Sequence, residues 1–205
     1  MEHKLYTLAE LEERKAAGQL EASESFTAIV ARAPWLLDLP QIVWRIVEEN
    51  ASTKAKLGKF RALAERIADA VRPSSVCSDG CSHCCYIPVS MSQSEAGWIG
   101  AATGIKPADV PRRTAQEYAD QQDDFLRVPC TFLNDDRCSI YEFRPLECRL
   151  HFNISASPMF CDTSIRSEES VVPNVDLSVF WIAYASLTAT IAYGDLREFF
   201  PKSKE

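Results

Sequence analysis

Apolar residues recur every three or four positions through much of the first 72 residues, which is the repeat of an amphipathic α-helix. The clearest stretch runs from Ser52 to Val71, where Lys and Arg separate the apolar positions and where Arg72 and Pro73 end the pattern. Its apolar positions are Leu57, Phe60, Leu63, Ala64, Ile67, Ala68 and Val71. The pattern predicts a long helix with one buried face.

Capping signals predict further helices on both sides of this stretch. Thr7 and Glu10 have the spacing of a capping box, in which a hydroxyl and a carboxylate each pair with a backbone N–H, and we expect the helix that they start to end near Gly18. A separate helix is expected over residues 25–33, because Pro34 stops it.

The same spacing occurs at Ser92 and Glu95, and it predicts a short helix that ends near Gly104. A longer helix is expected from about residue 109 to residue 126. Around residues 134–136 a polar turn separates short apolar runs, which is typical of a small hairpin.

Residues 177–194 contain no charged side chain, a length close to that of a membrane span. Hydroxyl residues interrupt this run. On a helical wheel one face carries Leu177, Phe180, Tyr184, Leu187 and Ile191. The pattern therefore favours a buried helix over about 175–193 and no membrane association.

Charge and composition narrow the function classes. The net charge of −7 argues against binding to a phosphate backbone, which needs clustered Lys and Arg, so no nucleic-acid partner is expected. No apolar segment follows a basic start at the N-terminus, so a cytoplasmic location is expected. Thiols stay reduced there, which makes a disulfide framework a poor explanation for the cysteines.

All eight cysteines lie between residues 77 and 161, and four of them fall in the stretch CSDGCSHCC. The C-x-x-C spacing of Cys81 and Cys84 forms a turn that points two thiolates at one ion, so the pattern favours metal ligation over packing or redox thiols. The expected ligands are Cys77, Cys81, Cys84, Cys85, Cys130, Cys138, Cys148 and Cys161.

Cys84 and Cys85 are adjacent, and adjacent side chains diverge, so two sites or one polynuclear cluster are favoured over a single zinc. Eight thiolates suffice for two four-coordinate centres, or for one iron–sulfur cluster with additional cysteines. The sequence leaves open how the thiols divide and whether the metal is zinc or iron.

Other polar residues lie close to the cysteines in the sequence. His83 and His151 are possible nitrogen ligands, but we expect them to hydrogen-bond or face solvent because the thiols suffice. A four-thiolate centre carries a charge of about −2, which nearby arginines can offset, although we expect at least one of them to be an ordinary surface residue. These arginines are Arg137, Arg144 and Arg149.

Two quoted motifs carry a family resemblance. CSDGCSHCC, followed by PCTFLNDDRCSIYEFRPLECR and then Cys161, resembles the CxxCxxCC cysteine-cluster family, which is described as a zinc- or iron-chelating domain. The resemblance covers residues 73–162. One departure is the spacing of Cys77 and Cys81, which have three residues between them where the family name implies two. One branch of that family is associated with lysine methylation of flagellin and with an iron–sulfur cluster.

The chain is therefore expected to be mainly α, with helical N-terminal and C-terminal segments packed around an irregular cysteine-rich core that a metal holds together. The expected division is a helical region at 1–72, a metal-binding domain at 73–165, and a buried helix with a tail at 166–205.

The leading functional hypothesis is a metal-binding protein that holds iron, as an iron–sulfur cluster, with zinc or another iron centre as the alternative. A structural zinc adaptor that binds a protein partner through its N-terminal helices is a second hypothesis. The resemblance also allows a metal-dependent protein-modifying enzyme related to lysine methylases, for which Tyr141, Glu142 and Arg144 are candidate polar groups.

Overall fold

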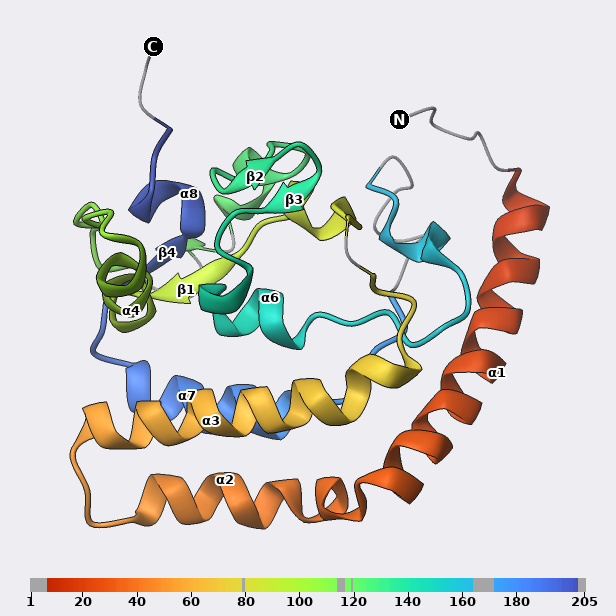
Figure 1. Ribbon diagram of the computed structural model, residues 1–205, viewed down its shortest axis with the longest axis horizontal. Helices are drawn as coiled ribbons and strands as arrows, with labels where there is room; N and C mark the ends of the chain where they lie inside the picture. The colour runs from red at the N-terminus through yellow and green to blue at the C-terminus, as the bar shows by residue number, and fades with distance from the viewer. Residues whose placement is uncertain (1–6, 79, 114–116, 119, 164–171, 203–205) are drawn as a thin grey trace.

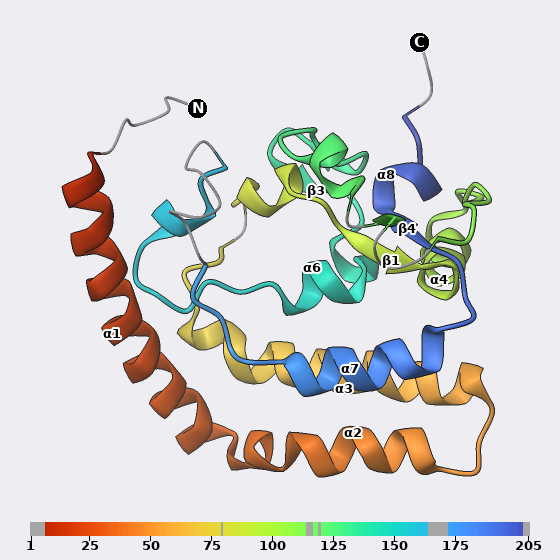
Figure 2. The same ribbon diagram turned by 180° about the vertical axis from the view of Figure 1, so that it is seen from behind.

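The computed structural model describes residues 7–78, 80–113, 117–118, 120–163 and 172–202. Long helices form one side of the molecule: α2 and α3 lie side by side, and α7 packs against both (Figures 1 and 2). Helix α1 joins this layer at one end and runs away from it along the edge. The bounds of these helices are Leu8–Arg32 for α1, Leu39–Glu48 for α2, Thr53–Val71 for α3 and Ser178–Thr188 for α7.

The cysteine-rich half lies across α3 from α2 and consists of short elements (Figure 1). Its helices are α4 (Gln93–Thr103), α6 (Leu146–Leu150) and α8 (Leu196–Phe199), and its strands are β1 (Ser90–Ser92), β2 (Leu133–Asn134), β3 (Arg137–Cys138) and β4 (Tyr193–Asp195). Short 3₁₀ helices occur at Pro34–Asp38, Arg72–Ser74, His83–Tyr86, Gln122–Phe125, Tyr141–Phe143 and Pro158–Cys161. The expected mainly α class is confirmed.

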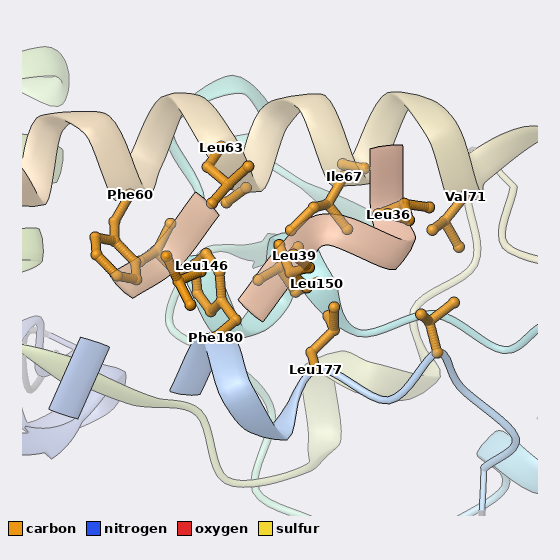
Figure 3. Packing of buried hydrophobic residues seen from close by; sticks show 14 of the residues in the cluster. Leu36, Leu39, Phe60, Leu63, Ile67, Val71, Leu146, Leu150, Leu177 and Phe180 are labelled. Atoms are coloured by element: carbon orange, nitrogen blue, oxygen red, sulfur yellow. The ribbon is translucent and has the colours of Figure 1, made fainter. Parts of the chain in front are cut away.

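The main hydrophobic core fills the space between α2, α3, α6 and α7 (Figure 3). The α3 positions that the sequence pattern singled out are all buried. Phe60 of α3 packs edge-on against Phe180 of α7, with ring centroids 5.1 Å apart. Leu146 and Leu150 bring α6 into the same core, so the segment that carries Cys148 is anchored on the helical layer.

The expected break near Gly18 is wrong, because α1 continues through it to Arg32 and absorbs the helix expected over 25–33. A glycine inside a helix costs about 1 kcal/mol relative to alanine, so a packing reason is needed. A Cβ at Gly18 would lie 2.6 Å from the ring of Phe160, which shows that the glycine permits a close approach rather than ending the helix.

The helix expected over residues 109–126 is also wrong for most of its length. Residues 105–113 contain no helix, and the remaining helical geometry in the described part of this stretch is confined to residues 117–118 and to the 3₁₀ helix at Gln122–Phe125. Residues 114–116 and 119 lie outside the described part. Pro107 and Pro111 lack an N–H and disfavour helix before them, and the N–H of Ala108 bonds to the carbonyl of Phe199 instead.

At the C-terminal end, the expected helix over 175–193 is confined to α7, and its last residue, Tyr193, is the first residue of β4. The backbone of residues 193–195 pairs with β1 in an antiparallel two-stranded sheet that the sequence analysis did not foresee. Phe180 and Tyr184 are buried as the wheel predicted. Over the described residues, no helix combines the length and the apolar character needed to cross a bilayer.

The expected hairpin is confirmed as the antiparallel pair of β2 and β3, in which Asn134 is opposite Arg137. Asp135 and Asp136 connect the strands, and both have positive φ. Two consecutive residues of this kind form the type I′ turn, which suits the twist of a hairpin and which Asp tolerates. The turn places Cys138 opposite Leu133.

Candidate metal centre

Six of the eight cysteines line a single cavity of about 80 Å³. They come from chain segments far apart in sequence: the 81–85 stretch, the hairpin region and α6. A smaller apolar cluster built around Val89, Met91 and Phe132 packs beside them. The six cysteines are Cys81, Cys84, Cys85, Cys130, Cys138 and Cys148.

Backbone hydrogen bonds join the first two cysteine segments. The N–H of Cys130 donates to the carbonyl of Cys85 at 2.7 Å, and the N–H of Arg127 donates to the carbonyl of Tyr86 at 2.7 Å. The N–H of Phe132 also points at the sulfur of Cys130, at 3.4 Å. The thiols of Cys85 and Cys130 are therefore held on neighbouring backbones.

A buried ion pair near the C-terminus reinforces this junction. The guanidinium of Arg197 donates to the carbonyls of Cys85 at 3.2 Å, Ile87 at 3.1 Å and Val128 at 2.7 Å. Its other end pairs with the carboxylate of Asp195 at 2.9 Å, and this carboxylate also accepts from the N–H of Val89 at 2.7 Å. Arg197 thus connects the segment that contains Cys85 to the segment that leads to Cys130.

Glu147 connects α6 to β1. Its carboxylate accepts from the hydroxyl of Ser90 at 2.6 Å and from the Ser90 N–H. Burial raises the pKa of Glu147 to about 7, an effect that the Ser90 hydrogen bonds partly offset. Cys148, the next residue, reaches the cavity from this helix.

Burial dominates the acid–base behaviour of the thiols. It raises the pKa of Cys130, Cys138 and Cys148. Cys84 and Cys85 differ from these thiols, because a hydrogen bond from the Cys85 thiol to the Cys84 sulfur lowers the pKa of Cys84 and raises that of Cys85, and the charge of Arg144 lowers the pKa of Cys84 further. Buried thiols of this kind ionise readily only beside a compensating cation.

Cys77 and Cys161 lie outside the cavity lining but close to it. Burial raises the pKa of Cys161 to about 12, and the charges of Cys77, Cys81 and Cys84 add to the rise, so these sulfurs are within electrostatic range of one another. The side-chain amide of Asn153 donates to the sulfur of Cys161 at 3.4 Å. Six of the eight cysteines thus line the cavity, and Cys77 and Cys161 do not.

All eight cysteines are free thiols. Within the described residues, no group of three or more His, Cys, Asp or Glu side chains is arranged to hold an ion as it stands. A cysteine thiol changes position by rotation about one side-chain bond between staggered rotamers. The donor set suits soft metals, because thiolates select zinc, copper(I) and iron–sulfur clusters.

The histidines and arginines close to the cysteines in sequence differ in whether they line the cavity. Neither His83 nor His151 lines the cavity, whereas Arg144 and Tyr141 do, with the guanidinium 4.0 Å from the ring centroid. Arg149 is buried but pairs with Glu65 of α3, and it donates to the backbone carbonyl of Glu142 at 2.8 Å.

The last of the three arginines, Arg137, is exposed on the hairpin. Of the arginines expected to offset thiolate charge, Arg144 is the one that lines the cavity.

Sequence reasoning missed Asp195 and Arg197 as residues that shape the site. A signal was available, because Asp195 and Glu198 have capping-box spacing and form a capping box at the start of α8. Asp136 of the hairpin turn also lines the cavity, and it accepts a hydrogen bond from the hydroxyl of Ser82 at 2.9 Å.

Residues 76–167 match the family model CxxCxxCC, described as "Putative zinc- or iron-chelating domain". The match contains all eight cysteines and confirms the resemblance inferred from the two motifs. Neither the curated proteins nor the solved structures include a match to the chain.

Proposed function

We propose that this chain is a metal-binding protein that holds iron, as an iron–sulfur cluster, in the cysteine-lined cavity. The observation that carries the proposal is the convergence of six thiols from three chain segments on one small cavity. The description of the matching family, zinc- or iron-chelating, supports metal binding of this broader kind. The proposal includes a cytoplasmic location, where such thiols stay reduced.

The proposed principal ligands are the six cysteines that line the cavity, namely Cys81, Cys84, Cys85, Cys130, Cys138 and Cys148. Cys77 and Cys161 do not line it and are the secondary members of the proposed set of eight. A tetrahedral zinc uses four ligands, so a cavity with more than four thiols favours a polynuclear centre over one zinc ion. When bound, an iron–sulfur cluster would supply one-electron redox chemistry or a structural cross-link.

Arg144 can compensate the negative charge of a thiolate-bound cluster. A cluster bound by four thiolates carries about −2, and a buried negative charge needs a nearby cation. Arg144 lines the cavity, and its charge already lowers the pKa of Cys84. Its role is to stabilise the thiolate form of the ligands.

The test is metal analysis of protein produced and purified without oxygen. The proposal predicts bound iron together with acid-labile sulfide, and a visible absorption band from thiolate-to-iron charge transfer. A colourless protein with stoichiometric zinc would instead support the structural adaptor. A protein that is folded without iron, zinc or sulfide would overturn metal binding altogether.

Matched serine variants test the ligand assignment. C148S removes a cavity thiol and should abolish or strongly reduce cluster incorporation, whereas C161S removes a thiol outside the cavity lining and should retain most of the metal. Equal loss of metal in both variants would contradict the proposed division.

A further inference from the structure

The capping-box carboxylate at the start of α4 has more partners than a cap requires. The Glu95 Oε2 atom accepts from the N–H and the hydroxyl of Ser92, each at 3.0 Å, as expected of a capping box. The same oxygen also accepts from the hydroxyl of Tyr184 in α7, at 2.8 Å. The Glu95 Oε1 atom accepts from the N–H of Leu146, the first residue of α6, at 3.0 Å.

The chain contains its own comparison for this arrangement. The capping box of Thr7 and Glu10 on α1 makes the same local hydrogen bonds but is exposed. Ser92 and Glu95 are 0% and 3% exposed, so the second box lies inside the protein. A carboxylate is costly to bury unless it is fully hydrogen-bonded, and Glu95 meets that requirement by joining three helices.

The link to α6 is the consequential one. Cys148 follows Leu146 by two residues on a helix of only five residues, and Cys148 lines the thiol cavity. The Leu146 N–H is a buried donor, and without Glu95 it loses the acceptor that fixes the first turn of α6. Any shift of that turn moves the Cys148 sulfur relative to the thiols on other segments.

We propose that Glu95 is a positioning residue for the metal centre, which holds α6 so that the thiol of Cys148 faces the other cavity cysteines. This inference rests on the proposed function, and it gives Glu95 a role that the capping pattern alone does not. Mutation of a residue that hydrogen-bonds to a metal ligand and orients it typically weakens metal affinity by about 10–100-fold.

Three substitutions separate positioning from general stability. E95Q keeps the size of the side chain, but its amide has one acceptor oxygen, so it cannot serve both the Ser92–Tyr184 side and the Leu146 N–H. Y184F removes the partner on α7 and leaves the link to α6 in place. E10Q weakens an exposed capping box that lies on α1.

The experiment measures metal affinity by chelator competition on the metal-loaded protein, together with the visible spectrum. E95Q should weaken metal binding by about tenfold or more and alter the charge-transfer bands, while Y184F and E10Q should change affinity by less than about threefold, well below that range. The inference is overturned if E95Q changes the metal affinity by less than about threefold, or if Y184F weakens binding as much as E95Q.

A second measurement separates this inference from the proposed function. Alkylation of the metal-free protein, followed by mass spectrometry, should show faster labelling of Cys148 in E95Q than in the wild type, with the labelling of Cys161 unchanged. If the wild type binds no metal, the proposed function fails, and this labelling still decides the role of Glu95. Unchanged labelling of Cys148 overturns it. Should E95Q fail to fold, E95D, which shortens the carboxylate arm and retains its charge, is read by the same comparison.

Discussion

Replacing Arg197 with methionine should destabilise the protein strongly, because this side chain joins the C-terminal segment to two cysteine segments. Its side chain is 7% exposed, and its guanidinium pairs with the carboxylate of the fully buried Asp195 side chain. R197M preserves much of the side-chain length but removes every donor. The Asp195 charge and the carbonyls of Cys85, Ile87 and Val128 are then left without this partner.

The expected loss follows from that geometry. Removing one partner of a buried ion pair costs about 3–5 kcal/mol, because the remaining charge stays desolvated. Asp195 keeps hydrogen bonds from the N–H groups of Val89 and Arg197, which places the expected loss toward the lower end of that range. A domain has a total stability of about 5–15 kcal/mol, so the change removes a large share of it.

Urea unfolding under reducing conditions, followed by tryptophan fluorescence, measures the change in the free energy of unfolding. K59M is the matched control, because Lys59 and Glu49 form an ion pair with both side chains more than 40% exposed. Such surface pairs contribute about 0–1 kcal/mol. A loss for R197M below about 1 kcal/mol, equal to that of K59M, would refute the reasoning that burial makes this pair important.

Three further outcomes are expected. G18A should destabilise the protein despite alanine's higher helix propensity, because its Cβ would meet the ring of Phe160. G58A on α3 has no atom within 4 Å of the new Cβ, so it should stabilise the protein by up to about 1 kcal/mol. Equal shifts of the thermal midpoint in the two variants would contradict the packing argument. Burial raises the pKa of Tyr184 and Tyr193. Their contribution to stability is therefore complete below the pKa of tyrosine in the unfolded chain, about 10, and is lost as the pH rises above it. Urea midpoints that do not fall above that pH would contradict this. Chelation of the metal-loaded protein should lower its thermal midpoint, since binding to the folded state alone stabilises that state, and an unchanged midpoint would show that the metal is peripheral.

The long helices were predictable where one local pattern agreed with tertiary packing. Every apolar position of the pattern from Leu57 to Val71 is buried, and Ser52 caps that helix. The prediction failed at Gly18, because a contact with Phe160, far away in sequence, decides whether the glycine ends the helix or packs inside it.

The candidate site was predictable in its residue types and not in its geometry. The spacing in CSDGCSHCC indicates a thiol site. Which cysteines line the cavity, and that Cys77 and Cys161 do not, depends on how the hairpin and α6 fold back on residues 81–85. Arg197 and Glu95 act on the site through hydrogen bonds that span more than 50 residues of sequence. Local patterns mark Glu95 and Asp195 as capping residues, but they carry no information on such long-range pairings, so the sequence did not reveal how Glu95 and Arg197 act on the site.

The central claim is that thiolates in one cavity bind a metal. X-ray absorption at the iron and zinc edges of anaerobically purified protein tests it most directly, because it identifies the element and its nearest neighbours together. The account predicts iron with a first shell made entirely of sulfur and a neighbouring iron atom. A first shell of nitrogen and oxygen, or folded protein without either metal, would contradict it.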